Sequence, residues 1–404
     1  MSLEQRLRNY IIAIPKINTH CHHMGHVFYD EIGLSEIFGS SYVAWCHRRF
    51  ETEEERKKLF DSISDRSYFI WLEKSLRQIY GIDERLNEKT WDRFDRSIRE
   101  ADRADHGFAR LRSLCRYEHI IEDCYWNYGD NLGDKELFTP AFRINIFLNG
   151  YDWDYVDRDG CCVSRFIPEK CKDIDVYVQK MAEVIGEKHR AGCVALKCAT
   201  AYERGLDFYP VSKERAEIAL QKNPSDLTAE NVADFQSYVF YKLCEIAARE
   251  NLPFQIHTGL GQLENTRAIH LTRAIKDHPD TKFVLFHLSF PYFDDVISLA
   301  HNHPNVYPDI CWVPLLSHNA ASDVINRLLD TVNAEKLCWG CDTWTVEESF
   351  GAILAMAYSL SKALTIRVQD GFMSEERAFE ICRRIMYTNA QALYKLNPQK
   401  GEEL

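Results

Sequence analysis

The sequence predicts an α/β fold, a (β/α)8 TIM barrel, on three observations. Eight short runs of apolar and β-branched residues recur along the 404 residues, helical stretches separate most of them, and metal-competent side chains stand where several of the runs end. Strand followed by helix, repeated, indicates parallel pairing. Because single barrels often exceed the usual domain size, we expect one domain over residues 1–404.

The first expected strand covers residues 17–23, and a charged, strongly helical block at about 27–114 follows it. This block is too long for a simple connection and too polar for a second domain with its own core. We therefore interpret it as a helical insertion over the mouth of the barrel.

The remaining expected elements alternate along the chain. Strands are expected at 119–126, 142–148, 193–200, 254–258, 282–289, 306–312 and 337–343, and helices at 173–190, 228–250, 265–277 and 322–333. A last helical stretch at 374–396 begins with Ser-Glu-Glu-Arg, which is typical of a helix start, and is expected to pack outside the barrel.

Composition excludes several classes of protein. With 46% apolar and 27% charged residues, the chain can bury a large core, and its net charge of −12 disfavours nucleic acid as a partner. The N-terminal apolar stretch is too short for a signal sequence, and no apolar run approaches the roughly 20 residues of a membrane span. We expect a cytoplasmic protein without a membrane partner, with its 14 cysteines reduced and buried; a homo-oligomer stays open.

His20 and His22 lie two residues apart at the end of the first expected strand. Residues at this spacing share one face of a strand, so both imidazoles can bind one ion inside the barrel. His23 then faces the opposite way.

Two further histidines end the fifth and sixth expected strands. In each strand the alternation of apolar residues separates His257 or His287 from the side chains that face the helices. Both positions are therefore expected at the carboxyl end of the barrel, where barrel enzymes carry their active sites.

Asp342 ends the eighth expected strand, where a buried carboxylate is costly unless it is paired or bound to metal. The alternative is a helix cap for the segment after Val346. Cys338 and Cys341, just before it, are spaced like a redox pair, but residues three apart on a strand face opposite sides and are not expected to meet.

Lys197 is expected inside the barrel, because Ala195, Lys197 and Ala199 alternate with an apolar face. A desolvated lysine has a lowered pKa, and its neutral amine can take up carbon dioxide to form a carbamate that bridges two metal ions. Alternatively, Lys197 stays an ammonium beside Asp342 or a substrate carboxylate.

Taken in order, these residues resemble the metal ligands of the amidohydrolase superfamily. The segments 197–206, 257–261 and 389–394 are most similar to its amidohydrolase-related (amidohydrolase 2-like) branch, which includes domains fused to glutamine-synthetase-like proteins. The His-Cys-His followed by a helical insertion is also similar to uronate isomerases, although their strand four is not expected to carry this lysine motif and their arginine-rich C-terminal site has no counterpart.

The resemblance implies a barrel enzyme with one or two divalent ions, expected to be zinc. His20, His22 and His257 would hold the ion in a mononuclear site; with carbamylated Lys197, His257 and His287 would hold a second one. Asp342 would be both ligand and base, and His287 could instead donate a hydrogen bond to the oxyanion.

The expected activity is hydrolysis of a carbon–nitrogen (amide-type) or ester bond in a small carboxylated substrate by a metal-activated water. A uronate isomerase, a decarboxylase and a catalytically silent binding barrel are the alternatives. Arginine binds carboxylates with two hydrogen bonds, which makes four residues near the expected mouth candidates for substrate binding: Tyr202, Arg204, Arg48 and Arg49.

Overall fold

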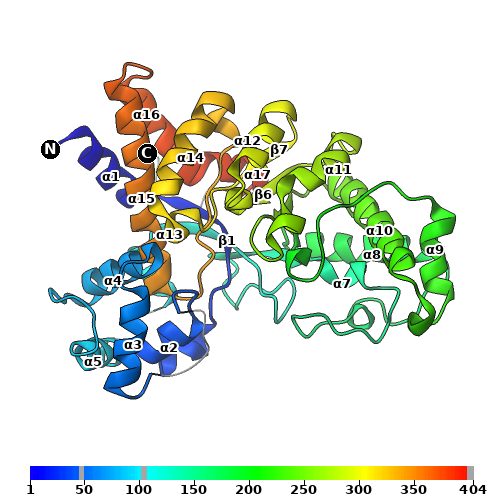
Figure 1. Cartoon of the computed structure of the whole chain (residues 1–404), viewed down its shortest axis with the longest axis horizontal. Helices are drawn as coiled ribbons and strands as arrows, with labels where there is room; N and C mark the ends of the chain where they lie inside the picture. Colours follow the sequence, from blue (N-terminus) through cyan, green and yellow to red (C-terminus); the bar gives the residue numbers. More distant parts are fainter. Residues whose placement is uncertain (45–49, 102–106, 398–404) are drawn as a thin grey trace.

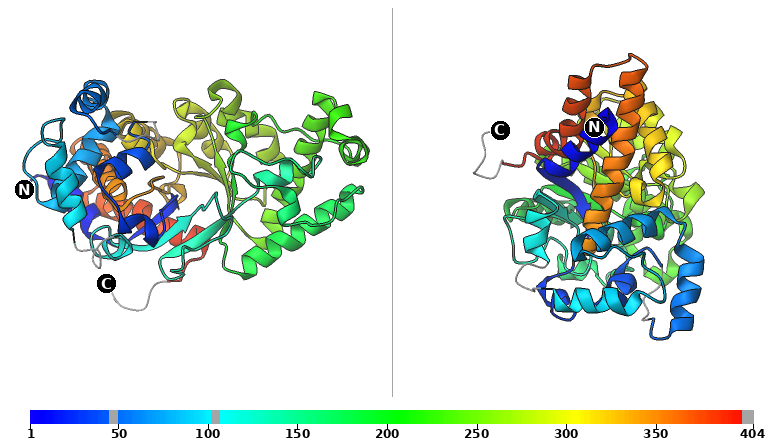
Figure 2. Two further views of the ribbon diagram at one scale, coloured as in Figure 1. Left: turned by 90° about the horizontal axis from the view of Figure 1, so that it is seen from below. Right: turned by 90° about the vertical axis from the view of Figure 1, so that its left-hand side faces the viewer.

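A computed structural model describes residues 1–44, 50–101 and 107–397. Its centre is a parallel sheet of seven strands whose order in space is their order in sequence (Figure 1, Figure 2). The strands are β1 (Lys16–Cys21), β2 (Tyr117–Glu122), β3 (Phe138–Arg143), β4 (Ala195–Cys198), β5 (Phe254–His257), β6 (Phe283–Phe286) and β7 (Val306–Pro308).

Residues 338–343 close this sheet into a ring without being a regular strand. On one side, the Cys338 amide donates to Pro308 O, 3.1 Å away, and Cys338 O accepts from the Ile310 amide at 2.9 Å. On the other side, the Asp342 amide donates to His20 O at 3.0 Å. The segment therefore occupies the place expected for the eighth strand, between β7 and β1, although only one isolated bridge, Asp309 to Cys338, has strand geometry.

The third and seventh strands differ from the sequence-based expectation. β3 begins and ends earlier than 142–148, and most of that run forms the short helix α7 (Asn145–Leu148). β7 has three residues, and the chain then turns at Trp312, whose φ is +66°. Short apolar runs do not distinguish buried strand from buried helix by periodicity, which explains the misplaced third strand.

Helices cover the sheet between and after its strands. They are α1 (Leu3–Ala13), α8 (Ile174–Arg190), α9 (Lys213–Gln221), α10 (Ala229–Glu250), α11 (Thr272–Asp277), α12 (Phe293–Asn302), α13 (Val313–Leu316), α14 (His318–Thr331), α15 (Val346–Gln369), α16 (Glu375–Arg383) and α17 (Asn389–Tyr394). Short 3-10 helices lie at 163–165, 200–202, 224–226, 263–266, 268–271, 287–289 and 334–336, and one π turn lies at 384–388.

The starts of helices α8 and α16 follow the usual capping preferences. The Asp173 side chain accepts from the amides of Asp175 and Val176 at the start of α8, and Ser374 accepts from Arg377 at the start of α16. In contrast, the expected helix 265–277 is broken into two 3-10 turns before α11.

The described residues between β1 and β2 are mostly helical. They include a 3-10 helix (His26–Asp30), α2 (Leu34–Ser40), α3 (Glu53–Ile63), α4 (Ser67–Tyr80), α5 (Trp91–Glu100) and α6 (Phe108–Ser113). Helices α2 to α5 gather at the lower left of Figure 1, well apart from α8 to α11, and α4 packs against α15. That this segment is an insertion into a simpler barrel stays a prediction.

The sequence analysis expected no apolar segment long enough to span a membrane, but helix α15 is one by length and composition. Most of this helix is buried inside the protein. A helix that is apolar on all sides and covered by protein is typical of a large core.

Candidate metal centre

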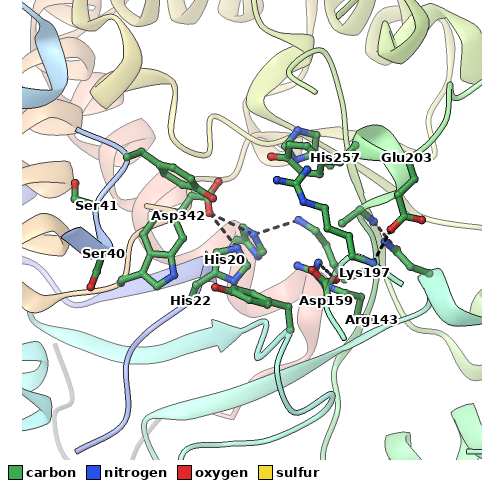
Figure 3. A pocket seen from close by; sticks show the side chains of 17 residues that line it. His20, His22, Ser40, Ser41, Arg143, Asp159, Lys197, Glu203, His257 and Asp342 are labelled. Atoms are coloured by element: carbon green, nitrogen blue, oxygen red, sulfur yellow. Dashed lines mark hydrogen bonds and ion pairs between the residues drawn. The ribbon is translucent and has the colours of Figure 1, made fainter. Parts of the chain in front are cut away.

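The strand ends bring five of the six expected ligand residues to one cavity of about 290 Å³ (Figure 3), whereas His287 is buried and does not line it. Its walls include His20, His22, Lys197, His257 and Asp342. The strand register explains this convergence, because Arg143 pairs with Lys197 and Lys197 with Gln255, so the carboxyl ends of β3, β4 and β5 are level.

His20, His22 and Asp342 form the first group of candidate ligands. Their ligand atoms lie within 4.8 Å of one another, and all three side chains are buried. Asp342 Oδ1 is 3.3 Å from His22 Nε2 and 3.7 Å from His20 Nε2, yet among the described residues it has no hydrogen-bond partner.

The position of the proton on the His22 ring explains why His22 and the Asp342 carboxylate do not form a hydrogen bond with each other. His22 Nδ1 is 2.7 Å from the carbonyl oxygen of Asp123, and since a carbonyl can only accept, Nδ1 carries the proton of the neutral ring. Burial lowers the pKa of His22 to about 4, so at neutral pH its Nε2 presents a lone pair to a carboxylate oxygen. When Asp342 is ionised, these two facing acceptors repel each other unless a cation lies between them.

His257 and His287 repeat this arrangement. The ring of His257 contacts Leu260 O at 3.1 Å through Nε2, and the ring of His287 contacts Cys311 O at 3.2 Å through Nδ1. A carbonyl can only accept, and two neutral rings carry two protons for these three contacts, so we assign the protons to the nitrogens that face the carbonyls. His257 Nδ1 and His287 Nε2 are then two lone pairs 3.1 Å apart.

The pKa values of the four histidines agree with neutral rings. Burial lowers the pKa of His287 to about 3 and places those of His20 and His257 well below the usual range, with Lys197 or a neighbouring histidine adding to the effect. Neutral imidazole is the form that binds metal. The donor set therefore fits divalent ions such as zinc, in one position at His20, His22 and Asp342 and in a second at His257 and His287.

Lys197 lies between these positions, with Nζ 3.1 Å from His20 Nε2 and 4.2 Å from the centre of the Phe286 ring. Burial lowers its pKa, and the carboxylates of Asp123 and Asp342 partly oppose this shift. The geometry is compatible with both roles expected for Lys197, a carbamate and an ammonium.

Asp342 has its pKa raised to about 7, first by burial, while the positive charge of Lys197 opposes the rise. Its φ of +56° is in the left-handed region, which a non-glycine residue adopts only when the surrounding contacts hold it there. The hydrogen bond from its amide to His20 O supplies one such contact.

Arg143 is a cavity residue that the sequence analysis missed. It ends β3, is 7% exposed, and binds Asp123 through Nε at 3.1 Å and Nη2 at 2.5 Å, and Asp159 through Nη1 at 2.5 Å. Placing the third strand at 142–148 hid its position at a strand end, which would otherwise have been the signal.

The expected substrate residues divide into three cases. Tyr202 lines the cavity and packs on His257, with ring centres 4.7 Å apart. Arg204 is turned away: its guanidinium lies over Phe208 and bonds to Gly205 O and Gln236, and it does not line the cavity. Arg48 and Arg49 lie outside the described residues.

Arg158, and not the expected Arg204, is the loop arginine that lines the cavity. Its guanidinium lies 4.7 Å from the centre of the Tyr202 ring, and it forms no ion pair with any carboxylate in the part of the chain that the structure describes. Loop residues have no periodicity, so no sequence signal pointed to it.

A closed ring of parallel strands with histidines and an acid gathered at one end is typical of metal-dependent barrel enzymes. The family model described as Amidohydrolase matches residues 215–396, a region that includes His257, His287 and Asp342. Over these residues, a little under half of the chain, the protein is similar to the amidohydrolase family.

Solved structures share this fold over nearly the whole chain. A uronate isomerase from Thermotoga maritima is 17% identical with a TM-score of 0.77, covering 97% of both chains. A glucuronate isomerase from Caulobacter crescentus is 16% identical with a TM-score of 0.73, covering 98% of this chain and 95% of that one. A Lactobacillus casei protein provisionally assigned as a metal-dependent hydrolase is 15% identical, with a TM-score of 0.70 and coverage of 96% and 97%.

Among curated proteins, protein fluG of Emericella nidulans is 29% identical over 225 residues, which are 51% of this chain and 26% of that protein. The chain therefore spans only part of the length of this relative.

Proposed function

We propose that the protein is a metal-dependent hydrolase that cleaves a carbon–nitrogen (amide-type) or ester bond in a small carboxylated substrate. The observation that carries the proposal is the pair of acceptor contacts, His22 Nε2 to Asp342 Oδ1 at 3.3 Å and His257 Nδ1 to His287 Nε2 at 3.1 Å. With Asp342 ionised, each contact becomes favourable when a cation lies between the two acceptors, which supports two ions rather than one.

Two zinc ions, or similar divalent ions, would supply Lewis acidity and a water that ionises near neutral pH. The carboxylate of Asp342 would accept a proton and would deliver it to the leaving nitrogen or oxygen. A carboxylate close to a cation has a lower pKa than the same group without it, which keeps Asp342 ionised and able to accept.

The other residues hold this arrangement in place. The Asp123 carbonyl fixes the ring of His22, and the carbonyls of Leu260 and Cys311 fix His257 and His287, so each free nitrogen points into the site. In the binuclear scheme Lys197 would act as a carbamate, formed when its neutral amine adds carbon dioxide and loses a proton.

Arg158 supports a carboxylated substrate. Arg143 is already neutralised by Asp123 and Asp159, and Lys197 packs against His20, so Arg158 is the guanidinium lining the cavity that stays free for an anion among the described residues. Stacking on Tyr202 limits its motion, which favours two-point binding of a carboxylate.

A substrate panel tests the proposal. Protein loaded with zinc and bicarbonate would be offered N-acyl amino acids, carboxylated amides and esters, uronic acids, and aromatic carboxylic acids. Release of amine, ammonia or alcohol supports hydrolysis; isomerised sugar or carbon dioxide would instead assign the isomerase or decarboxylase alternative, which the shared fold also accommodates.

A further inference from the structure

Two cysteines meet directly behind the metal ligands. Cys21 lies between His20 and His22, and Cys341 precedes Asp342. Their sulfur atoms are 3.3 Å apart although the residues are 320 positions apart in sequence. Both side chains have no exposed surface, and the ring closure between β1 and residues 338–343 brings them together.

The two thiols have different surroundings. Cys341 Sγ accepts from Asn18 Nδ2 at 2.8 Å and is 3.1 Å and 3.4 Å from the hydroxyls of Thr343 and Ser349. Cys21 Sγ instead donates to Thr343 O at 2.8 Å. Asn18 donates to Cys341 Sγ and the two hydroxyls can also donate, so these contacts stabilise negative charge on Cys341 better than on Cys21. Cys21 is placed to react with it second.

We propose that Cys21 and Cys341 form a reversible disulfide on oxidation by a hydroperoxide. Cys341 sulfur attacks one peroxide oxygen, the O–O bond breaks, and the thiol proton leaves with the other oxygen as water (or as alcohol from an organic peroxide). Cys21 sulfur then attacks the resulting sulfenic acid, the S–O bond breaks, and the hydroxyl leaves with the Cys21 proton as a second water. Both sulfurs are oxidised, and one peroxide is reduced.

This bond would disturb the ligands on both sides. A disulfide requires a sulfur separation of about 2.0 Å, so the sulfurs must approach by more than 1 Å and Cys341 must leave its donors. Asp342 follows Cys341 directly, so it would move with Cys341. A metal site tolerates displacements of its ligand atoms of only a few tenths of an ångström. We therefore expect the oxidised protein to bind metal more weakly. This second step depends on the proposed metal site, whereas the disulfide itself does not.

The first measurement is made on the wild-type, metal-loaded chain. After a hydrogen peroxide series, free thiols are alkylated in denaturant and the protein is digested and analysed by mass spectrometry. We expect a linked pair containing Cys21 and Cys341, a mass lower by two hydrogens, and reversal by dithiothreitol. Cys162 is the internal control, because it alone among the described cysteines is not fully buried.

Variants identify the partners. Cys21→Ser and Cys341→Ser should each abolish the linked product, whereas Cys338→Ser, equally buried three residues from Cys341, should keep it. Oxidation of Cys162 while Cys21 and Cys341 stay reduced in the wild type would overturn the proposal, and so would a link formed through other cysteines.

Metal release is followed in the same samples with a chromogenic zinc chelator. We expect several-fold faster zinc loss from the linked form, restored by dithiothreitol, and unchanged loss from peroxide-treated Cys21→Ser. A linked form that holds zinc as tightly as the reduced form would overturn the coupling to the ligands. A wild-type chain that binds no zinc before oxidation would instead refute the proposed metal site, with the disulfide still measured by mass.

Discussion

His257 Nδ1 and His287 Nε2 face each other at 3.1 Å with no proton to share, because each ring donates its proton to a carbonyl on its far side. The same relationship recurs between His22 Nε2 and the carboxylate of Asp342. Without cations, the contact between the two histidines lowers the stability of the folded state, and so does the contact with Asp342 once its carboxyl group is ionised. Metal binding should therefore stabilise the protein as well as activate it.

The first prediction concerns metal content. Purified wild-type protein should hold close to two divalent ions per chain, and metal should raise its melting temperature. His20→Asn with His22→Asn, and separately His257→Asn with His287→Asn, should each lose at least one ion, while His301→Asn on exposed α12 serves as the control. Elemental analysis measures the content; full occupancy in either double variant would refute its ligand assignment.

The second prediction concerns Asp342. Asp342→Asn removes the base and one ligand, so turnover of the substrate found by the panel should fall by several orders of magnitude, with part of the metal retained by the histidines. Asp280→Asn, on the exposed surface, should be unaffected. Steady-state kinetics at saturating metal checks this, and activity within tenfold of wild type would show that another group is the base.

The placement of the candidate ligand residues could be predicted because strand ends carry them in a fixed order, and alternation along a strand determines which side chains face inward. The place of Arg143 in the cavity could not be predicted, because we expected its strand to begin four residues later than it does. Arg158 and the Cys21–Cys341 contact depend on a loop and on ring closure, and neither leaves a periodic pattern. The helical block after β1 was recognised from its composition, but its packing on α15 was not.

The third prediction separates two arginines. Arg158→Lys should raise KM for a carboxylated substrate by about tenfold or more, since an ammonium cannot reproduce two-point binding, with kcat and metal content nearly unchanged. Arg204→Lys should leave KM unchanged, because Arg204 points away from the cavity. Equal KM values for Arg158→Lys and wild type would remove Arg158 from the substrate site.

The fourth prediction concerns Arg143. Arg143→Met leaves Asp123 and Asp159 without their shared cation. Breaking a buried ion pair in this way should lower the free energy of unfolding by about 3–5 kcal/mol. Arg99 is exposed and bound to Asp95 and Glu36. Changing it to methionine should lower the free energy of unfolding by about 1 kcal/mol or less. Urea denaturation of both variants gives the comparison, and equal losses would contradict it.

The fifth prediction concerns pH and Lys16. Its ammonium is fully buried, donates to Ile12 O and Ile14 O, and burial lowers its pKa from 10.5 to about 7. Between these values the unfolded chain binds more protons than the folded one, so the free energy of unfolding should rise with pH, by up to about 1.4 kcal/mol per pH unit from this group.

Lys16→Met should remove that part of the slope. Other groups titrate in the same range, so the readout is the difference between the wild-type and variant slopes in denaturation experiments from pH 7 to 10.5. Parallel slopes would show that Lys16 titrates normally in the fold.

The ring closure also sets an order of events during synthesis. Cys21 and Cys341, which mark the two halves of the ligand set, are 320 residues apart, and the ring cannot close until the later half has left the ribosome. A nascent chain therefore exposes His20 and His22 long before their carboxylate partner exists. Full metal binding can only follow near-complete translation, so truncated chains that end before residue 338 should fail to retain metal even where their helices have formed.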